Sequence, residues 1–240
     1  MRQVFLQSPW IHPEEPIELR RILQTFGKRT HVKAGTSLPH GEGKAYVGLL
    51  EKGLGAFEFE DMAGRSHIFA LIVPGRCFGD LDALTQNRLN LRGTVIRDST
   101  VILLSREKWE EEIARSPDLL KLYAKNAICK EEAHMEGMIA NFTMDLPSRI
   151  RTLLRSVVSS FYEVKEDGWN PLPIKLSVLE ISRIVAANRS SVSLVFSEWM
   201  EKGLIRRDGR RLIVNGQLLT QVYDWADRIP PDDVSVSDPF

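Results

Sequence analysis

The sequence has few cysteines and no long apolar run. Only two of its 240 residues are cysteine, Cys77 and Cys129, and they form no CxxC motif. A disulfide framework and a zinc ribbon are therefore excluded. No stretch approaches the roughly 20 apolar residues that a membrane helix needs, and the N-terminus lacks the apolar region of a signal peptide. We expect a cytoplasmic protein without a membrane partner.

Histidine clusters and net charge are also missing. The five histidines include no His-x-His pair, so a cupin-like metalloenzyme would have to use His31, His40 and Glu42. We predict no metal site, no catalytic residues and no enzyme activity. Lys and Arg number 32, as do Asp and Glu, and this zero net charge excludes a wholly basic protein. Hydrophobic residues make up 43% of the chain, enough for a sizeable core.

The charge is distributed unevenly along the chain. Residues 147–215 carry 12 basic and seven acidic side chains, whereas residues 216–240 carry one basic and five acidic ones. A basic block attached to a neutral one is typical of a nucleic-acid module, with ordinary surface scatter as the alternative. We expect four segments. They are a β-rich sensor-like domain at 1–116, a helix at 117–145, a basic domain at 146–229 and a disordered acidic tail at 230–240.

Short apolar runs alternate with turn residues in the first domain. The runs lie at 46–50, 55–60, 67–73, 94–96 and 101–104, with Gly, Pro and Asp between them. This pattern predicts an antiparallel sandwich or barrel. A helix over Ile17–Phe26 precedes it, and another starts at Arg106 with Ser105 as its N-cap.

A long helix is predicted from about Pro117 to Met144. Its seam repeats at spacings of 4, 3, 4, 3 and 4 residues: Ala124, Ile128, Glu131, Met135, Met138 and Phe142. The heptad-like repeat predicts a homodimer interface, with packing on the helix's own domain as the alternative. We expect His134 and Cys129 on the surface of this helix. A second helix, Ser148–Phe161, and a loop at 164–173 follow.

Residues 174–214 carry the most specific local pattern. Ser177 and Glu180 form an S-x-x-E capping box for a short helix, Val178–Val185. After a tight turn, Asn188 is the expected cap of a second helix, Arg189–Lys202. The apolar face of that helix consists of Val192, Val195, Phe196, Trp199 and Met200. A basic β-hairpin around an Asp-Gly pair completes a winged helix-turn-helix.

The winged helix-turn-helix predicts binding to double-stranded DNA. Arg189, Ser190 and Ser193 face solvent on the first turns of the second helix, where compact polar groups reach base edges in the major groove. Ser177 and Ser191 are candidate phosphate donors. The hairpin adds four candidate contacts: Arg206, Arg207, Arg210 and Arg211. The alternatives are solvated surface arginines and a module that binds protein instead.

Two stretches resemble the CRP/FNR superfamily of bacterial transcription factors, named after the cyclic-AMP receptor protein and the fumarate-nitrate regulator. PGRCFGDL at 74–81 is similar to the family's P-G-x-x-x-G-E-L turn. Residues 179–205 are similar to its helix-turn-helix pattern through Glu180, Ile181, Arg189, Val192, Leu204 and Ile205. The resemblance covers about residues 20–215. It implies an α+β fold with an antiparallel β-roll of the cyclic-nucleotide-binding, jelly-roll type, a dimerisation helix and a winged helix-turn-helix.

The resemblance also implies roles for the recognition helix. Arg189 would read a base, with Ser190 and Ser193 helping to set sequence preference. Many members have Glu at the position of Ser190, and a further Arg is common at the position of Leu194. The usual operator half-site of the family is therefore not expected.

The expected effector pocket departs from the family pattern. Members that bind cyclic nucleotides use a Glu for the ribose and an Arg-Ser or Arg-Thr for the phosphate. Here Asp80 stands at the Glu position, and Arg92 is followed by Gly93, with Arg88 as a competing candidate. Cys77 is either a pocket contact or a small buried residue. We favour a vestigial pocket, with Asp80 and Arg92 as surface or strand-end groups.

We predict no cofactor for this chain. The iron–sulfur branch of the family needs N-terminal cysteines, and residues 1–30 contain none. No spacing of His31, His40 or His67 points to haem. The sequence therefore predicts a homodimeric DNA-binding regulator that cyclic nucleotides do not gate. Its partners would be a two-fold-symmetric site and, as a further candidate, RNA polymerase. Gating by haem or another small molecule stays open as the alternative.

Overall fold

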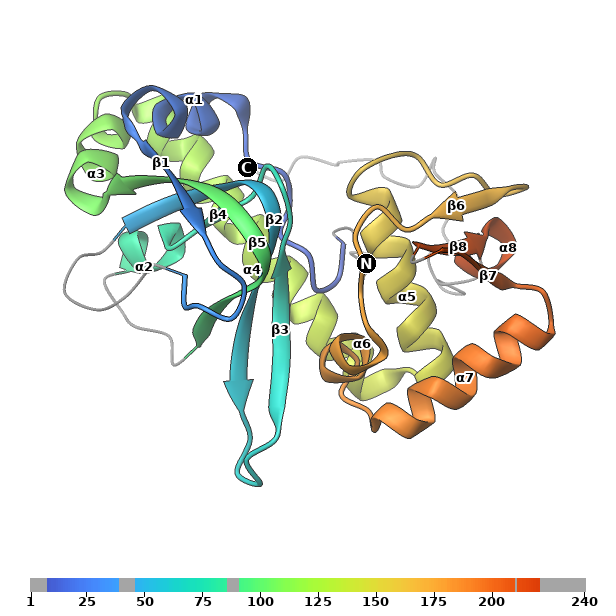
Figure 1. The fold of residues 1–240 in the computed structure, drawn as a ribbon. Coiled ribbons are helices and arrows are strands. Elements are labelled where there is room, and N and C mark those ends of the chain that lie inside the picture. Colours follow the sequence, from blue (N-terminus) through green and yellow to red (C-terminus); the bar gives the residue numbers. More distant parts are fainter. Residues whose placement is uncertain (1–7, 39–45, 86–90, 210, 221–240) are drawn as a thin grey trace, which may run out of the picture.

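The chain forms two lobes connected by one long helix. The computed structural model describes residues 8–38, 46–85, 91–209 and 211–220. An N-terminal β-rich lobe and a C-terminal helical lobe lie side by side, and helix α4 (Pro117–Thr143) runs from the first toward the second (Figure 1). This arrangement confirms the predicted α+β fold. Across the described segments, no helix combines the length and apolar character needed to cross a membrane.

The N-terminal lobe is an antiparallel sheet in the order β1-β5-β2-β3, with β4 paired to β2. The strands are β1 (Lys28–Val32), β2 (Tyr46–Glu60), β3 (Ser66–Ile72), β4 (Cys77–Phe78) and β5 (Arg92–Ser105). The sequence pattern wrongly divided β2 and β5 into two strands each. Register shifts occur between Leu50 and Gly55, and Gly53 adopts a φ of +103°, so the strand bends there without ending.

Three helices accompany this sheet: α1 (Ile17–Phe26), α2 (Asp80–Thr85) and α3 (Arg106–Ala114). α1 has the predicted bounds, and Ser105 caps α3 by accepting a hydrogen bond from the amide of Lys108 at 3.3 Å. A hydrophobic core joins Leu23 of α1 and Trp109 of α3 to strands β2 and β5. This core holds α1 and α3 against the end of the sheet next to which α4 begins.

Helix α4 has two different faces. The face toward the sheet is buried and rich in polar groups, including Asn126, Lys130 and His134. His134 was expected at the surface, so that prediction was wrong. The opposite face exposes the predicted seam: Ile128, Met135, Met138 and Phe142. Ile128 is 60% exposed and Phe142 is 88% exposed, so this seam does not pack on its own domain.

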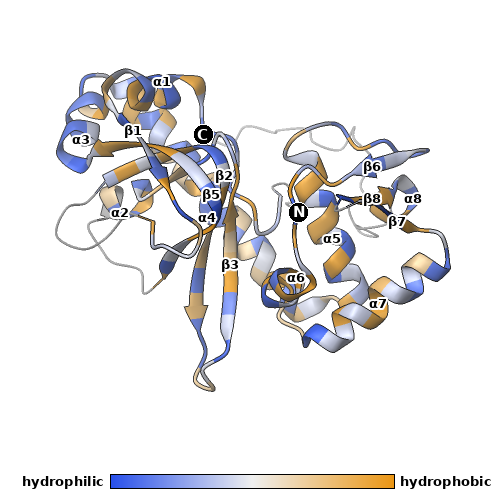
Figure 2. Cartoon of the chain, in the orientation of Figure 1, coloured by the Kyte–Doolittle hydropathy of each residue, from blue (hydrophilic) through white to orange (hydrophobic). Residues whose placement is uncertain are grey.

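The C-terminal lobe surrounds helix α5. Its elements are α5 (Leu146–Ser159), β6 (Trp169–Pro171), α6 (Val178–Ile184), α7 (Arg189–Glu201), β7 (Ile205–Asp208), β8 (Arg211–Asn215) and α8 (Gly216–Thr220). The strands pair in the order β6-β8-β7. α5 begins at Leu146 instead of Ser148, because Asp145 caps it by accepting from the amide of Ser148 at 2.8 Å. β6 lies in the predicted loop. Apolar residues concentrate on α5 at the middle of this lobe (Figure 2).

The two lobes share one hydrophobic core. Trp10, Ile11 and Leu71 of the N-terminal lobe belong to the same buried cluster as Ile150 of α5 and Ile184 of α6. Ion pairs reinforce this contact. Arg97 of β5 binds the Glu180 carboxylate at 2.7 Å, and Arg183 of α6 lies 3.0 Å from Glu58 of β2. The orientation of α5 and α6 thus depends on the β-rich lobe.

Candidate nucleic-acid interface and effector pocket

Helix α6 begins with the predicted capping box. The Ser177 hydroxyl oxygen accepts from the Glu180 amide at 3.2 Å, and the Glu180 carboxylate accepts from the Ser177 amide at 2.7 Å. The Ser177 hydroxyl also donates to this carboxylate at 2.9 Å, so its proton is already engaged. Asn188 stands at the N-cap position of α7, but its side chain makes no capping hydrogen bond, unlike the prediction.

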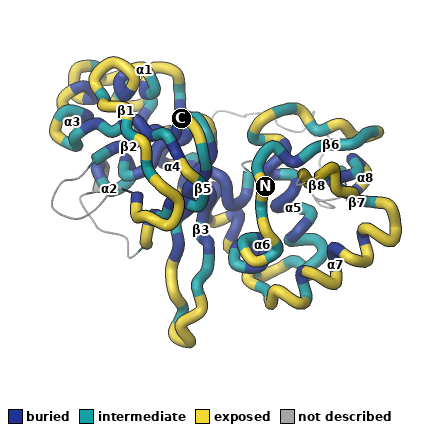
Figure 3. Tube along the Cα trace, in the orientation of Figure 1, coloured by how far each residue is buried: buried dark blue, intermediate teal, exposed yellow. Residues whose placement is uncertain are grey.

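The first turns of α7 present polar groups to solvent. Arg189, Ser190 and Ser193 are exposed, and Ser191 is half-buried. Leu194 is 71% exposed on the same stretch of helix, an unusual position for a large apolar side chain. The inner face is buried at Val192, Val195, Phe196 and Trp199, as predicted, whereas Met200 is exposed. The outer turns of α7 and the β7–β8 hairpin are exposed together (Figure 3).

A cleft of about 670 Å³ lies between residues 172–181, α7 and the β7–β8 hairpin. Most of its lining is apolar, and its polar lining residues are Lys175, Ser177, Arg189, Arg207 and Arg211. The structure therefore brings three of the predicted arginines and one predicted serine to a single surface. Lys175 precedes the capping box and was not singled out from the sequence, although its place in the basic block was a signal.

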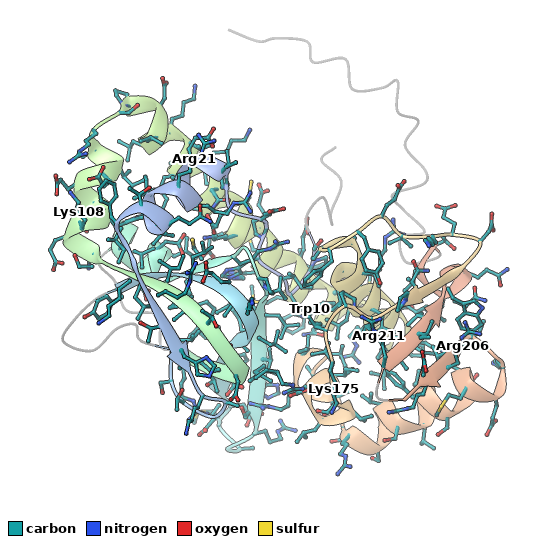
Figure 4. The ribbon with its side chains drawn as sticks, turned by 45° about the horizontal axis from the view of Figure 1, so that its top comes forward. Trp10, Arg21, Lys108, Lys175, Arg206 and Arg211 are labelled. Carbon is teal, nitrogen blue, oxygen red and sulfur yellow. The ribbon has the colours of Figure 1, made fainter. Side chains whose placement is uncertain are left out.

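The hairpin positions its arginines by stacking and by strand register. The Arg206 guanidinium lies 4.2 Å from the centre of the Trp169 ring, a cation–π contact that joins β7 to β6. Arg206 and Arg211 both project from the strands of the hairpin (Figure 4). Arg210 lies outside the described residues.

A buried ion cluster occupies the place of the expected effector pocket. The Lys130 ammonium is 0% exposed and lies 2.5 Å from the Asp80 carboxylate, and it also pairs with Glu15. Burial alone would lower the pKa of Lys130, but the Asp80 and Glu15 carboxylates outweigh burial and raise that pKa. The two carboxylates therefore favour the charged form of Lys130. Asp80 is buried and paired, so the prediction that it is a surface group was wrong.

Two histidines extend this cluster. The Nε2 atoms of His12 and His134 lie 2.8 Å apart, a hydrogen bond that requires at least one neutral ring. Complete burial, together with the nearby His134 and Lys130, lowers the pKa of His12 well below its ordinary value. His12 is thus neutral in the folded protein. The sequence could not predict that His12 pairs with His134, or Lys130 with Glu15 and Asp80, because these residues lie far apart in the chain.

Of the remaining described pocket candidates, Cys77 adjoins this cluster, because its amide donates to the Glu15 carboxylate, whereas Arg92 lies apart from it. The Arg92 guanidinium is 60% exposed and lies 3.4 Å from the Glu58 carboxylate, while Asp80 binds Lys130. Cys77 is fully buried, and burial raises the pKa of its thiol. Arg88 lies outside the described residues. The cleft beside His12, Asp80 and His134 has a volume of only about 30 Å³. Among the described residues, no three His, Cys, Asp or Glu side chains gather as metal ligands.

Comparison with known proteins identifies the fold. No family model matches the sequence. A cyclic AMP receptor protein from Thermus thermophilus is 23% identical over 199 residues, which cover 83% of this chain and 88% of that protein. The structure of FixK2 from Bradyrhizobium japonicum superposes with a TM-score of 0.70 at 18% identity, covering 80% of this chain and 95% of FixK2.

A CRP/FNR-family transcriptional regulator from Thermus thermophilus has a TM-score of 0.60 at 20% identity, covering 81% of this chain and 97% of that structure. The chain has the fold of the CRP/FNR transcriptional regulators. The sheet β1–β5 is the β-roll of the CRP/FNR fold, α4 is its long helix, and α6, α7 and the β7–β8 hairpin are its winged helix-turn-helix. The resemblance inferred from the sequence is confirmed at this level.

Proposed function

We propose that this protein is a homodimeric, sequence-specific DNA-binding transcriptional regulator of the CRP/FNR type. The single observation that carries the proposal is that Arg189 of α7 and Arg207 and Arg211 of the hairpin line one cleft. Its relatives by sequence and by fold are transcriptional regulators. A recognition helix that exposes an arginine and small polar side chains suits the major groove.

The contacts divide into two kinds. Arg189 can donate two hydrogen bonds to a guanine, and Ser190 and Ser193 can bond to neighbouring base edges. The methyl groups of Leu194 fit the methyl group of a thymine, where a second arginine would demand an acceptor. The remaining candidates serve the phosphate backbone: Ser191, Lys175, Arg206, Arg207, Arg210 and Arg211. Because the Ser177 hydroxyl is held by Glu180, its contribution is to fix the N-terminus of α6.

The exposed seam of α4 is the proposed dimer interface. Ala124, Ile128, Met135, Met138 and Phe142 repeat at coiled-coil spacing on the face that the β-roll leaves uncovered. Pairing of two α4 helices would bury this apolar stripe and place two recognition helices about one DNA turn apart, roughly 34 Å. The operator would then be two-fold symmetric.

Cyclic nucleotides are not expected to gate this protein. Asp80, at the position of the ribose-binding Glu, is buried against Lys130, and the adjacent cleft of about 30 Å³ holds roughly one water molecule. Pockets for small ligands occupy about 300–1,000 Å³. A nucleotide would have to break the ion cluster before it could bind.

Two substitutions test the division of DNA contacts. Arg189→Ala should weaken binding to the preferred site by roughly 1–3 kcal/mol and relax specificity at one base pair. Arg207→Ala should weaken binding to all sequences about equally and reduce the salt dependence by about one phosphate contact. Fluorescence anisotropy on the preferred site and its single-base variants, at several salt concentrations, measures both effects. Equal losses from Arg189→Ala on every sequence would contradict the base-reading role.

A further inference from the structure

A short N-terminal segment, Trp10–Glu15, fills the groove between the β-roll and α4; we call it the strap. Its backbone is fixed to the β-roll. The Leu71 amide donates to the Trp10 carbonyl at 2.7 Å, and Ile11 forms a parallel bridge with Leu71. The Arg76 guanidinium donates to the His12 carbonyl at 3.0 Å. The strap thus adds to β3 and to the turn that precedes β4.

The side chains of the strap contact α4 at regular intervals. Successive buried strap residues meet successive turns of the helix in antiparallel order: Trp10 lies against Gly137, His12 bonds to His134, and Glu15 pairs with Lys130. Asn126, one turn farther, donates to the Glu15 carboxylate at 2.5 Å. The strap therefore contacts about three turns of α4 and not a single point.

Lys130 joins the strap to the turn of the β-roll. Its ammonium, on α4, binds Glu15 of the strap and Asp80 at the start of α2. The Cys77 amide also donates to the Glu15 carboxylate at 3.2 Å. Three separate parts of the chain therefore meet at one buried cation. A buried cluster of this kind tolerates few alternative arrangements, because each displaced charge would be left unpaired in the interior.

The same segment reaches the DNA-binding lobe. Trp10 lies at the junction of the two lobes (Figure 4) and shares its hydrophobic cluster with α5 and α6. Arg76, which holds the strap at His12, also donates to the Ser160 carbonyl at the end of α5, at 3.1 Å. A shift of the strap would therefore disturb α4 and the winged helix-turn-helix together.

We propose that the strap, fixed by Lys130, is a built-in occupant of the groove between the β-roll and α4, and that it holds α4 and the DNA-binding lobe in the DNA-binding orientation without a small-molecule effector. This inference rests on the proposed function. The strap residues and Lys130 are positioning residues, because none of them lines the cleft beside α7. Through its contacts over about three turns of α4, the strap stabilises this orientation of α4 relative to any other.

Two variants displace the strap by different means. Lys130→Met removes the shared cation, and Lys125→Met is its matched control, because Lys125 is an exposed lysine on the same helix. Gly137→Leu leaves every charge in place. A Cβ atom at position 137 would lie 2.9 Å from the Trp10 ring, so the strap must move, while leucine favours the helix more than glycine does.

The variants are compared in two assays without added ligand. The first is affinity for the preferred DNA site and for random DNA; the second is amide hydrogen exchange across residues 8–16 and 117–143. Suppose that the variants reduce the fraction of the protein in the DNA-binding orientation to about one tenth. The affinity for the preferred site then falls about tenfold, while the affinity for random DNA is unchanged. Both segments should exchange faster in Lys130→Met and Gly137→Leu, and as in the wild type in Lys125→Met.

The outcomes separate the strap from the proposed function. Suppose that Gly137→Leu accelerates exchange in the strap but binds the preferred site with wild-type affinity. The strap would then contribute only to packing and not to DNA binding, and the proposal would be overturned. Unchanged exchange in both variants would also overturn it. Absence of any preferred DNA site for the wild type would instead refute the regulator function. If Lys130→Met does not fold, Gly137→Leu alone decides.

Discussion

Glu180 connects α6 both to its own N-terminus and to the β-roll. Its carboxylate accepts from the Ser177 amide at 2.7 Å and from the Arg97 guanidinium at 2.7 and 2.8 Å. Glu180→Ala therefore removes half of the capping box and the ion pair with Arg97, whereas Arg97→Ala removes that pair and the hydrogen bond from Arg97 to the Lys175 carbonyl. A lost cap costs about 0.5–2 kcal/mol. A pair whose arginine is 36% exposed contributes about 0.2–1 kcal/mol.

The free energy of unfolding should thus fall by about 1–3 kcal/mol in Glu180→Ala and by no more than about 1 kcal/mol in Arg97→Ala. The loss in the double variant should be smaller than the sum of the two single losses, because both single variants remove the same ion pair. Urea unfolding followed by circular dichroism measures all three. Lys202→Ala, which breaks an exposed pair with Glu198, serves as the control and should change stability by less than about 0.5 kcal/mol. Strictly additive losses in the double variant would refute the coupling between the lobes.

Two further predictions concern the dimer and pH. Ile128→Glu places a charge on the exposed seam of α4 and should shift the protein from dimer to monomer in analytical ultracentrifugation; Lys33→Glu, at an exposed lysine outside α4, should not, and a dimeric Ile128→Glu would contradict the interface. Burial lowers the pKa of His12 in the folded protein. As the pH falls below about 6.5, His12 is therefore protonated in the unfolded chain before it is protonated in the folded one. The free energy of unfolding is thus retained above that pH and decreases below it. His12→Gln should reduce this slope in thermal unfolding between pH 7 and pH 5, and an unchanged slope would show that His12 does not cause it.

The helix-turn-helix was predicted well because its signals are local. The capping box of Ser177 and Glu180, the period of α7 and the Asp-Gly turn each act within a few residues. The seam of α4 was likewise visible as a repeat, and the structure exposes it. The long strands were less predictable, because Gly53 is a typical turn residue in the sequence. In the structure it lies within β2, where the strand bends and its register shifts.

The strap and its ion cluster could not be found from the sequence. Lys130 and Glu15 are charged residues, which usually lie at the surface, and their pairing spans 115 positions in the chain. The buried side of α4 is polar, so the helix lacks the amphipathic pattern from which a contact with the β-roll could have been predicted. His134 was misplaced for the same reason. Only the assembled β-roll shows that these groups satisfy one another.

The most direct test of the account uses the purified protein without any added ligand. The protein is mixed with fragmented genomic DNA of its source, the retained fragments are sequenced, and Arg189→Ala is treated in parallel. The account predicts a two-fold-symmetric motif with half-sites about one helical turn apart, which the variant no longer selects. No enriched motif, or the same motif recovered by Arg189→Ala, would contradict it.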